Sequence, residues 1–562
     1  ASAYSSYSPS RQQSVSTIAN FEQSSTDIEG HAFTLTKEFD HVQLKYIGAF
    51  RELYDQSYAD LGGGKGLEPG QDPHGNGSTS KKVFRLDSNE YCGQAAEFVL
   101  GAGQCTPLVY PKVSQEQFSH ELQLSGDAFD GTVDYIVGAY YFEETAQEDN
   151  TPLHHQLSGP INLGLPSVAA IPGIGALLGG ITDPLTTFRA VNMLSQKYDI
   201  DNSAAAIFGQ FTWTPKILDE RLHLTFGARH SEDERKTVKF QRDMTIAETA
   251  LTAIDVSFVQ CGSNPLNADC RNFDSIPASQ DFSNDSFSFV AEYDITDDIN
   301  IYGKRVEAYK SGGFNTRDPQ KDGNQGPATD GNDYGFGYAD GFDAEYVTSY
   351  ELGLKSELMD RRLRINANVF FSQYEDMQLN FILTGTVADT KVTNAGEAEM
   401  YGFETDITFM LTRELLLMAN YAYLNTEVTK ATDINGNDAS DKFVFFSAPE
   451  NSFTLSADYT LFQADWGTGS ANISVNYMDE RNGGSRAENV KNTHLRQYEL
   501  VNARLSLSDI AFADGRLGAG IWAKNLLDTE YELTAVDNLP QADRSVIWGE
   551  PRTFGLDVFY EY

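Results

Sequence analysis

The sequence predicts an all-β protein, a transmembrane antiparallel β-barrel with about 17 strands in this chain, long extracellular loops and short periplasmic turns. Apolar and polar residues alternate with period two in one segment after another, as strands between two different environments require. The connections between these segments are alternately short and long, which is typical of an outer-membrane barrel. The chain also ends on a strand whose last residue is aromatic, Tyr562.

The C-terminal strand shows the alternation clearly. Phe554, Leu556, Val558, Tyr560 and Tyr562 share one face, and mostly smaller or polar residues occupy the other. A sheet in lipid must close on itself, because unpaired backbone groups at an edge are costly in hydrocarbon. A soluble β-sandwich gives the same alternation. The number of strands, the asymmetry of the loops and the terminal aromatic residue favour the barrel.

Composition agrees with a barrel and excludes several other classes. Apolar residues make up 40% of the chain and aromatic residues 12%, and the mean hydropathy is -0.39. Helical membrane proteins are far more apolar, whereas half of each barrel strand faces a polar lumen. The formal net charge of -40 argues against nucleic acid as a partner. We expect a solvated acidic surface rather than a specific ion site.

Seventeen segments carry the strand pattern, and all but the last pair into hairpins with turns of a few residues. The predicted strands are 31–39 with 42–54, 115–125 with 132–142, 203–214 with 221–239, 283–293 with 300–309, 346–356 with 363–373, 400–409 with 414–426, 452–461 with 470–478, 500–508 with 517–525, and 553–562.

The predicted hairpins divide the chain into an N-terminal arm or loop, residues 1–30, and an outer-membrane β-barrel, residues 31–562. Long loops are expected at 58–113, 147–202, 242–282, 311–344, 428–449, 479–498 and 528–550.

One of these loops contains an apolar segment, residues 161–185, which is interrupted by Pro166, Pro172, Gly173 and Gly175. The uninterrupted apolar length is too short for a transmembrane helix. We expect a folded loop with a short helix that lies outside the bilayer, over the barrel mouth or against a partner.

Five stretches occur in the order found in TonB-dependent outer-membrane receptors, and their sequences resemble the barrel of that family. They are residues 117–124, 309–315, 394–404, 525–531 and 549–555, the fourth with Leu527 where phenylalanine is commoner. The positions that carry the resemblance are Gly312, Gly313, Asn315, Asn394, Gly396, Gly402, Glu404, Asn525, Asp528, Pro551, Arg552 and Tyr562.

The resemblance implies uptake of a scarce nutrient, often a ferric siderophore, across the outer membrane of a Gram-negative bacterium. Energy would come through the TonB complex, outer-membrane lipid would surround the barrel, and the ligand would be small. Family barrels have about 22 strands and a plugged lumen. This sequence shows no plug-like domain and no TonB-binding segment. We therefore expect a plug and the first strands to lie on another polypeptide, to be cleaved but retained, or to be otherwise absent from this chain.

Two other functions stay open at this point. One is a plugless barrel that acts as a surface anchor or interaction platform without active transport. The other is a soluble or surface-attached β-rich binding protein.

Charged and amide side chains at alternate positions of the strands are the candidates for lining the lumen. In the family such groups contact the plug or line the path of the solute, and their alternative role is simply to be solvated. The candidates are His223, Arg229, Arg364, Asn366, Glu404, Asp406, Asp458, Asn472 and Arg504.

The residues give no reason to expect an enzyme or a bound cofactor. No nucleophile, base and orienting group occur at a readable spacing. Residues 433–438 begin like a calcium-binding loop, but the glycine and glutamate that such a loop needs further on are missing, so we expect a turn there. A calcium ion bound in this loop is the one cofactor that stays open, and no cofactor or metal ligand is predicted elsewhere.

The first testable prediction concerns the four cysteines, which form two local pairs, Cys92 with Cys105 and Cys261 with Cys270, in loop segments. Local pairs in loops indicate disulfides and an oxidising compartment. Each disulfide closes a short loop and is expected to stabilise the fold by about 3 kcal/mol. Alkylation without reductant, followed by mass spectrometry, should find no free thiol. Alkylation at any of the four cysteines would contradict the pairing.

Overall fold

The computed structural model describes residues 25–56, 112–150, 156–158, 189–248, 253–255, 273–316, 341–382, 390–432, 437–484, 493–536 and 545–562. All four cysteines and the apolar segment 161–185 lie outside these residues. No helix within the described ranges is both long enough and apolar enough to cross a membrane.

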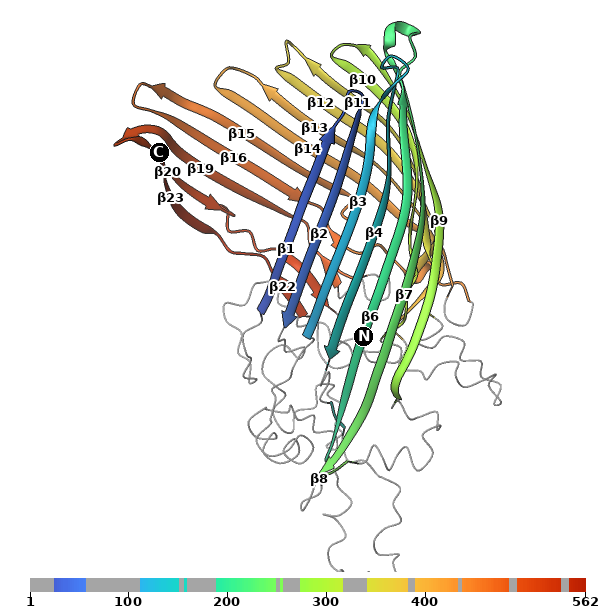
Figure 1. Cartoon of the computed structure of the whole chain (residues 1–562). Helices are drawn as coiled ribbons and strands as arrows, with labels where there is room; N and C mark the ends of the chain where they lie inside the picture. Colours follow the sequence, from blue (N-terminus) through green and yellow to red (C-terminus); the bar gives the residue numbers. More distant parts are fainter. Residues whose placement is uncertain are drawn as a thin grey trace, which may run out of the picture.

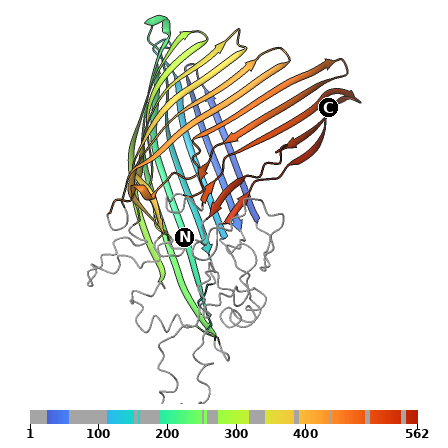
Figure 2. The same cartoon turned by 180° about the vertical axis from the view of Figure 1, so that it is seen from behind.

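The described chain forms one large antiparallel sheet of 17 strands, which confirms the predicted fold class. Two short strands, β5 and β8, extend this sheet at the loop end. Each main strand pairs with its neighbour in the sequence, so that the sheet is a continuous meander. Figures 1 and 2 show that the sheet is strongly curved, with the short turns between strands at one end.

The first half of the meander contains the three longest strands, β6, β7 and β9, which run well beyond the predicted segments. The strands of this half are β1 (Ser25–Glu38), β2 (Val42–Gln56), β3 (Lys112–Ala128), β4 (Val133–Asn150), β5 (Gln156–Ser158), β6 (Arg189–Trp213), β7 (Leu222–Glu248), β8 (Ala253–Asp255), β9 (Phe273–Thr296) and β10 (Ile299–Lys310).

The second half contains nine further main strands and two small hairpins within its loops. The strands are β11 (Glu345–Leu358), β12 (Leu363–Ile382), β13 (Thr390–Met410), β14 (Leu415–Ala431), β15 (Asn451–Ala464), β16 (Gly467–Met478), β17 (Arg481–Asn482), β18 (His494–Leu495), β19 (Tyr498–Phe512), β20 (Gly515–Lys524), β21 (Glu532–Val536), β22 (Ser545–Trp548) and β23 (Thr553–Glu561). Two single 3-10 turns, η3 (Leu218–Glu220) and η5 (Ser440–Lys442), complete the described elements.

Several loop boundaries differ from those expected from the sequence. The end of the expected arm belongs to β1, and the ends of the expected loops 147–202 and 242–282 belong to long strands. Residues 528–550 contain the β21–β22 hairpin, and residues 479–498 contain the β17–β18 pair. Polar loop-end segments pair because a neighbouring strand supplies the backbone partner, although their composition resembles that of a loop.

The two faces of the sheet have different chemistry. Burial alternates strictly along most of β3, whose outward residues Phe118 and Leu122 are exposed. The same outward face carries Ile207, Leu352 and Leu505, each at least half exposed to solvent in the isolated chain. Large exposed apolar side chains on one face of a closed or curved sheet are typical of contact with lipid.

The sheet has two free edges. Within the described residues no pairing joins β1 to β23, and Figures 1 and 2 show the two strands apart. All residues of β1 are exposed, and β23 presents Phe554 and Leu556 at 70% and 69% exposure. Unpaired backbone groups at such edges are costly in hydrocarbon, so both edges need a partner there.

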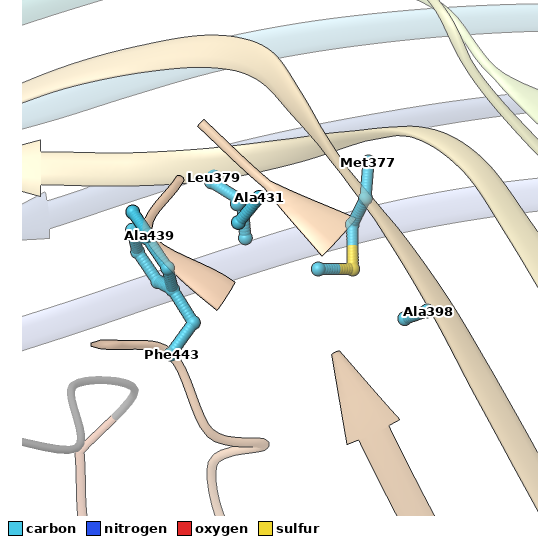
Figure 3. Close-up of a cluster of buried hydrophobic side chains, with 6 residues drawn as sticks. All are labelled: Met377, Leu379, Ala398, Ala431, Ala439 and Phe443. Atoms are coloured by element: carbon cyan, nitrogen blue, oxygen red, sulfur yellow. The ribbon is translucent and has the colours of Figure 1, made fainter. Parts of the chain in front are cut away.

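One loop folds onto the wall of the sheet through a small apolar cluster, which we call the β14–β15 clasp. It consists of Met377, Leu379, Ala398, Ala431, Ala439 and Phe443, all buried (Figure 3). Backbone bonds reinforce it: Ala439 donates to the carbonyl of Ala431 at 2.8 Å, and the Ala431 amide donates to Ser440 Oγ at 2.9 Å. Residues 439–443 of the β14–β15 connection are therefore fixed to the strands.

The clasp generates a prediction. Phe443→Ala removes the largest ring of this cluster, and such a deletion from a packed site costs about 3 kcal/mol. Because the cluster holds one loop rather than the sheet, we expect faster hydrogen exchange over residues 437–445 with little change in global stability. Phe446→Ala is the matched control, since Phe446 is 57% exposed. Equal exchange in the two variants would contradict the role of the clasp.

Candidate functional site

The nine lumen candidates share one face of the sheet. Strand register places them opposite the exposed apolar side chains, for example Asn472 between Asp458 and Arg504 in one transverse row. Asn366 faces Asp406 in the same way across β12 and β13. We refer to this side of the sheet as the inward face.

Some of these candidates contact each other directly. Asn366 Nδ2 donates to Asp406 Oδ1 at 3.2 Å, and an Arg364 Nη2 atom lies 3.9 Å from the same oxygen. Asn472 Nδ2 donates to Asp458 Oδ1 at 2.7 Å. These pairs are part-buried or exposed, so each contributes little to stability and keeps its polar atoms accessible.

The other candidates bond to residues that sequence reasoning did not select. Arg504 Nη1 donates to Asp557 Oδ2 at 2.5 Å, and Asp557 also accepts from the indole of Trp522 at 3.1 Å. Glu404 accepts a long bond from Asn368 Nδ2 at 3.4 Å. The two contacts of Asp557 tie β19, β20 and β23 together on the inward face, and the Glu404 bond joins β12 to β13.

The two remaining candidates lie on β7. His223 lies 2.9 Å from Thr214 Oγ1 and 3.1 Å from Asp294 Oδ2, near the turn end. Arg229 lies over two rings, with its guanidinium carbon 5.6 Å from the centre of Tyr140 and 5.8 Å from that of Phe208. Cation–π contacts of this kind fix an arginine without an acid partner.

A polar cluster that sequence reasoning missed lies on β3, β4 and β6. Glu144 accepts bonds from Gln115 and Gln117 at 2.5 Å each and from Asn202 at 3.0 Å. We call these four residues the Glu144 cluster. Period-two alternation along β3 could have indicated the two glutamines, but Glu144 fell beyond the predicted strand end and Asn202 in a predicted loop.

A second missed cluster joins β7 to the end of β10. Arg235 Nη2 donates to Asp233 Oδ1 at 2.8 Å and to Ser311 Oγ at 2.8 Å, and the Tyr309 hydroxyl also donates to Asp233. Pairing of β10 with β9 stops at Val306. The last residues of β10 therefore bond to β7, two strands away, and bring the base of the following loop to the wall.

The family-like positions near this loop hold its base in place. Gly313 and Phe342 exchange backbone bonds at 3.0 and 2.8 Å. A Cβ atom on Gly312 would lie 2.0 Å from the Phe342 carbonyl oxygen, so no larger residue fits there without a shift. Asn315 donates to the carbonyl of Val392 and accepts from its amide. These contacts fix both ends of the loop that follows β10.

Asn394 is the centre of the same arrangement. Its Nδ2 atom donates to the carbonyls of Asp343, Ala344 and Asp376 at 2.8, 3.1 and 2.9 Å, and its Oδ1 accepts from the Asp343 amide at 2.6 Å. A single amide side chain thus satisfies backbone groups from two segments. The neighbouring Gly396 lies against Leu379 of the clasp.

Gly402 occupies a place on β13 where only a hydrogen atom fits. An added Cβ would lie 2.3 Å from the Tyr423 carbonyl oxygen and 2.6 Å from the Phe370 ring. The ring of Phe370 therefore covers this glycine on the inward face, two residues before the candidate Glu404.

The C-terminal family-like positions close the connection between β20 and β23. Asn525 is 4% exposed and has a positive φ of 49°. Its side chain bonds to Thr529 and to the carbonyl of Glu550, while Asp528 accepts from the Arg552 amide at 2.9 Å. Asparagine tolerates this left-handed conformation better than most residues. Pro551 is exposed, and Tyr562 is 98% exposed at the end of the chain.

A groove of about 690 Å³ crosses six strands from β2 to β9 near the loop end. Its lining residues form three adjacent rows, and the two outer rows, including Glu52, Glu116 and Asp201, carry their side chains on the outward face. A smaller cavity of about 530 Å³ adjoins Phe443 of the clasp.

No group of three or more metal-binding side chains occurs among the described residues. Of the calcium-like segment 433–438, only Asn437 and Asp438 belong to the described part. Backbone and side-chain hydrogen bonds from Ser440 lower the pKa of Asp438 below its usual value. Asp438 thus accepts hydrogen bonds that hold a local turn.

Comparison with known proteins gives one family. The family model described as TonB dependent receptor-like, beta-barrel, matches residues 3–526. The metal-pseudopaline receptor of Pseudomonas aeruginosa is 29% identical over 223 residues, which cover 39% of this chain and 28% of that protein. The ferric-pyoverdine M114 receptor of a Pseudomonas species is 25% identical over 216 residues, 37% of this chain and 24% of that receptor.

Solved structures share the fold. The ferric yersiniabactin uptake receptor of Yersinia pestis aligns with a TM-score of 0.59 at 15% identity, and the siderophore receptor PiuA of Acinetobacter baumannii aligns with 0.56 at 14%. Each alignment covers 96% of this chain, but only 62% and 65% of the respective receptors. The chain therefore spans less than two thirds of the length of these receptors.

The contacts of Asn394 generate a prediction. Asn394→Ala leaves four backbone groups without their side-chain partner. Asp343 and Asp376 are exposed, so water can replace the amide there, but Ala344 is buried, and a buried carbonyl left unsatisfied costs about 1 kcal/mol or more. We expect a lower temperature of heat-modifiable migration and faster proteolysis near residues 341–344. Gln373→Ala on β12 serves as control, because Gln373 makes one exposed bond at 3.3 Å. Identical behaviour of both variants would argue against the anchoring role.

Proposed function

We propose, from the premise that this chain belongs to the TonB dependent receptor-like β-barrel family, that it supplies the barrel wall of an outer-membrane receptor for a scarce nutrient such as a ferric siderophore. The family consists of transport receptors rather than enzymes. The observation that supports the proposal best is the difference between the two faces of the sheet, which places polar groups inside and apolar groups outside.

The inward face supports a solute path rather than a packed core. Its carboxylates accept hydrogen bonds from neighbouring amides on a half-buried wall. Asp406, Asp458 and Glu144 each accept one from an asparagine or glutamine side chain. A face of this composition is stable against water or against a polar plug, and it is unsuited to lipid.

The wall would act as a rigid support. Asn394, Asn315 and Gly312 fix the bases of the loops, and these loops would capture the ligand. Fixed side chains lose less conformational entropy when a ligand binds. Movement of a plug, driven through TonB, would then open the path.

The plug and the first strands of the barrel would come from protein other than the described residues. The free edges of β1 and β23 support this proposal, because each needs a backbone partner in lipid. The alignments, which cover 62% and 65% of two solved receptors, also support it.

The test is energy-dependent uptake. Cells that produce the receptor should accumulate radioactive iron supplied as ferric siderophores, and a protonophore should abolish accumulation while leaving surface binding intact. Cells without the gene are the control. Binding without uptake would instead support a surface anchor or interaction platform. If the cells neither bound nor accumulated the ferric siderophores, the proposal would be overturned.

A further inference from the structure

The Glu144 cluster contains a carboxylate whose hydrogen-bond partners are all neutral. Oε2 of Glu144 accepts from Gln115 and Gln117, and Oε1 accepts from Asn202. All four side chains are half-buried on the inward face. In the described part of the chain no lysine, arginine or histidine forms an ion pair with Glu144. Its charge is therefore stabilised by dipoles alone, and no cation neutralises it.

The chemistry of the carboxylate fixes the orientation of the three amides. An ionised carboxylate accepts hydrogen bonds and cannot donate them, so each amide turns its NH₂ group toward Glu144. The amide oxygens then remain as acceptors, and no described residue donates to any of them. The cluster therefore combines one negative charge with three amide oxygens, each able to accept hydrogen bonds.

The neighbouring cation does not change this balance. Arg235 is paired in register with Asn202 on the adjacent strand, and its guanidinium is bonded to Asp233 and Ser311. Asp233 also accepts from Tyr309. Because Arg235 already has an acid partner, the negative charge of Glu144 remains available to a ligand.

The charge of the whole chain acts in the same direction. The formal net charge of -40 creates a negative potential that attracts cations and repels anions at long range. A ligand that carries a positive group is thus favoured both on approach and at the cluster.

We propose that the Glu144 cluster binds a protonated amine of the transported ligand. An ammonium group has three N–H donors and no acceptor, which suits a carboxylate surrounded by amide oxygens. Hydrogen bonds between such charged partners are about twice as strong as neutral ones. This inference rests on the proposed function and adds to it the chemical class of the ligand, a metal chelate with a free ammonium group.

The experiment uses matched pairs of ferric chelates. Trihydroxamate, catecholate and carboxylate chelates are each prepared with one terminal ammonium group and in the N-acetylated, uncharged form, and their dissociation constants for the outer-membrane receptor are measured. The variants are Glu144→Gln and, as matched control, Glu143→Gln. Glu143 precedes Glu144 on β4 and lies on the outward face, where it accepts from Tyr141 at 3.2 Å.

For a chelate that binds, we expect the wild type and Glu143→Gln to prefer the ammonium form by about tenfold, which corresponds to about 1.4 kcal/mol. Glu144→Gln should lose this preference and bind the acetylated form unchanged. Equal binding of both forms by the wild type, or a preference that survives in Glu144→Gln, would overturn the inference alone. Loss of both forms in Glu144→Gln would show a structural role and also overturn it. If the wild type bound none of the chelates, the proposed function would fail as well.

Discussion

Backbone hydrogen bonding in a medium without water is the constraint on which this structure depends. A strand in hydrocarbon must find a partner for every N–H and C=O group on both sides. The antiparallel meander meets this need between β1 and β23, where each main strand pairs with its neighbours over most of its length. The same constraint makes the two outer edges the least complete part of the described sheet.

Because the backbone is satisfied by the sheet, the side chains are free to differ on the two faces. The outward face carries large apolar groups such as Ile207 and Leu352, and the inward face carries acids, amides and arginines. On the inward face some of these groups form ion pairs across neighbouring strands, as Arg364 does with Asp406. Glu144 differs from this pattern, since only amides surround it.

Loops need a different solution, because they leave the sheet and its regular bonds. Here a few amide side chains and glycines replace the missing strand pairing. Asn394 satisfies backbone groups of two segments, and Asn525 does the same between β20 and β23. The positions that resemble the family at these places thus act in the architecture of the wall, and the polar clusters that could meet a ligand lie at other positions.

The sequence by itself determined the faces and the order of the strands. Period two assigns Arg504 and Leu505 to opposite faces whatever their neighbours are, and short turns force successive strands to be antiparallel neighbours. The tertiary structure decided how far the strands extend and which side chains meet. Polar segments such as residues 196–202 become strand only because β4 and β7 offer backbone partners on both sides. Glu144 meets Gln117 and Asn202, which are 27 and 58 positions away in the sequence, through a register that the alternation alone does not specify.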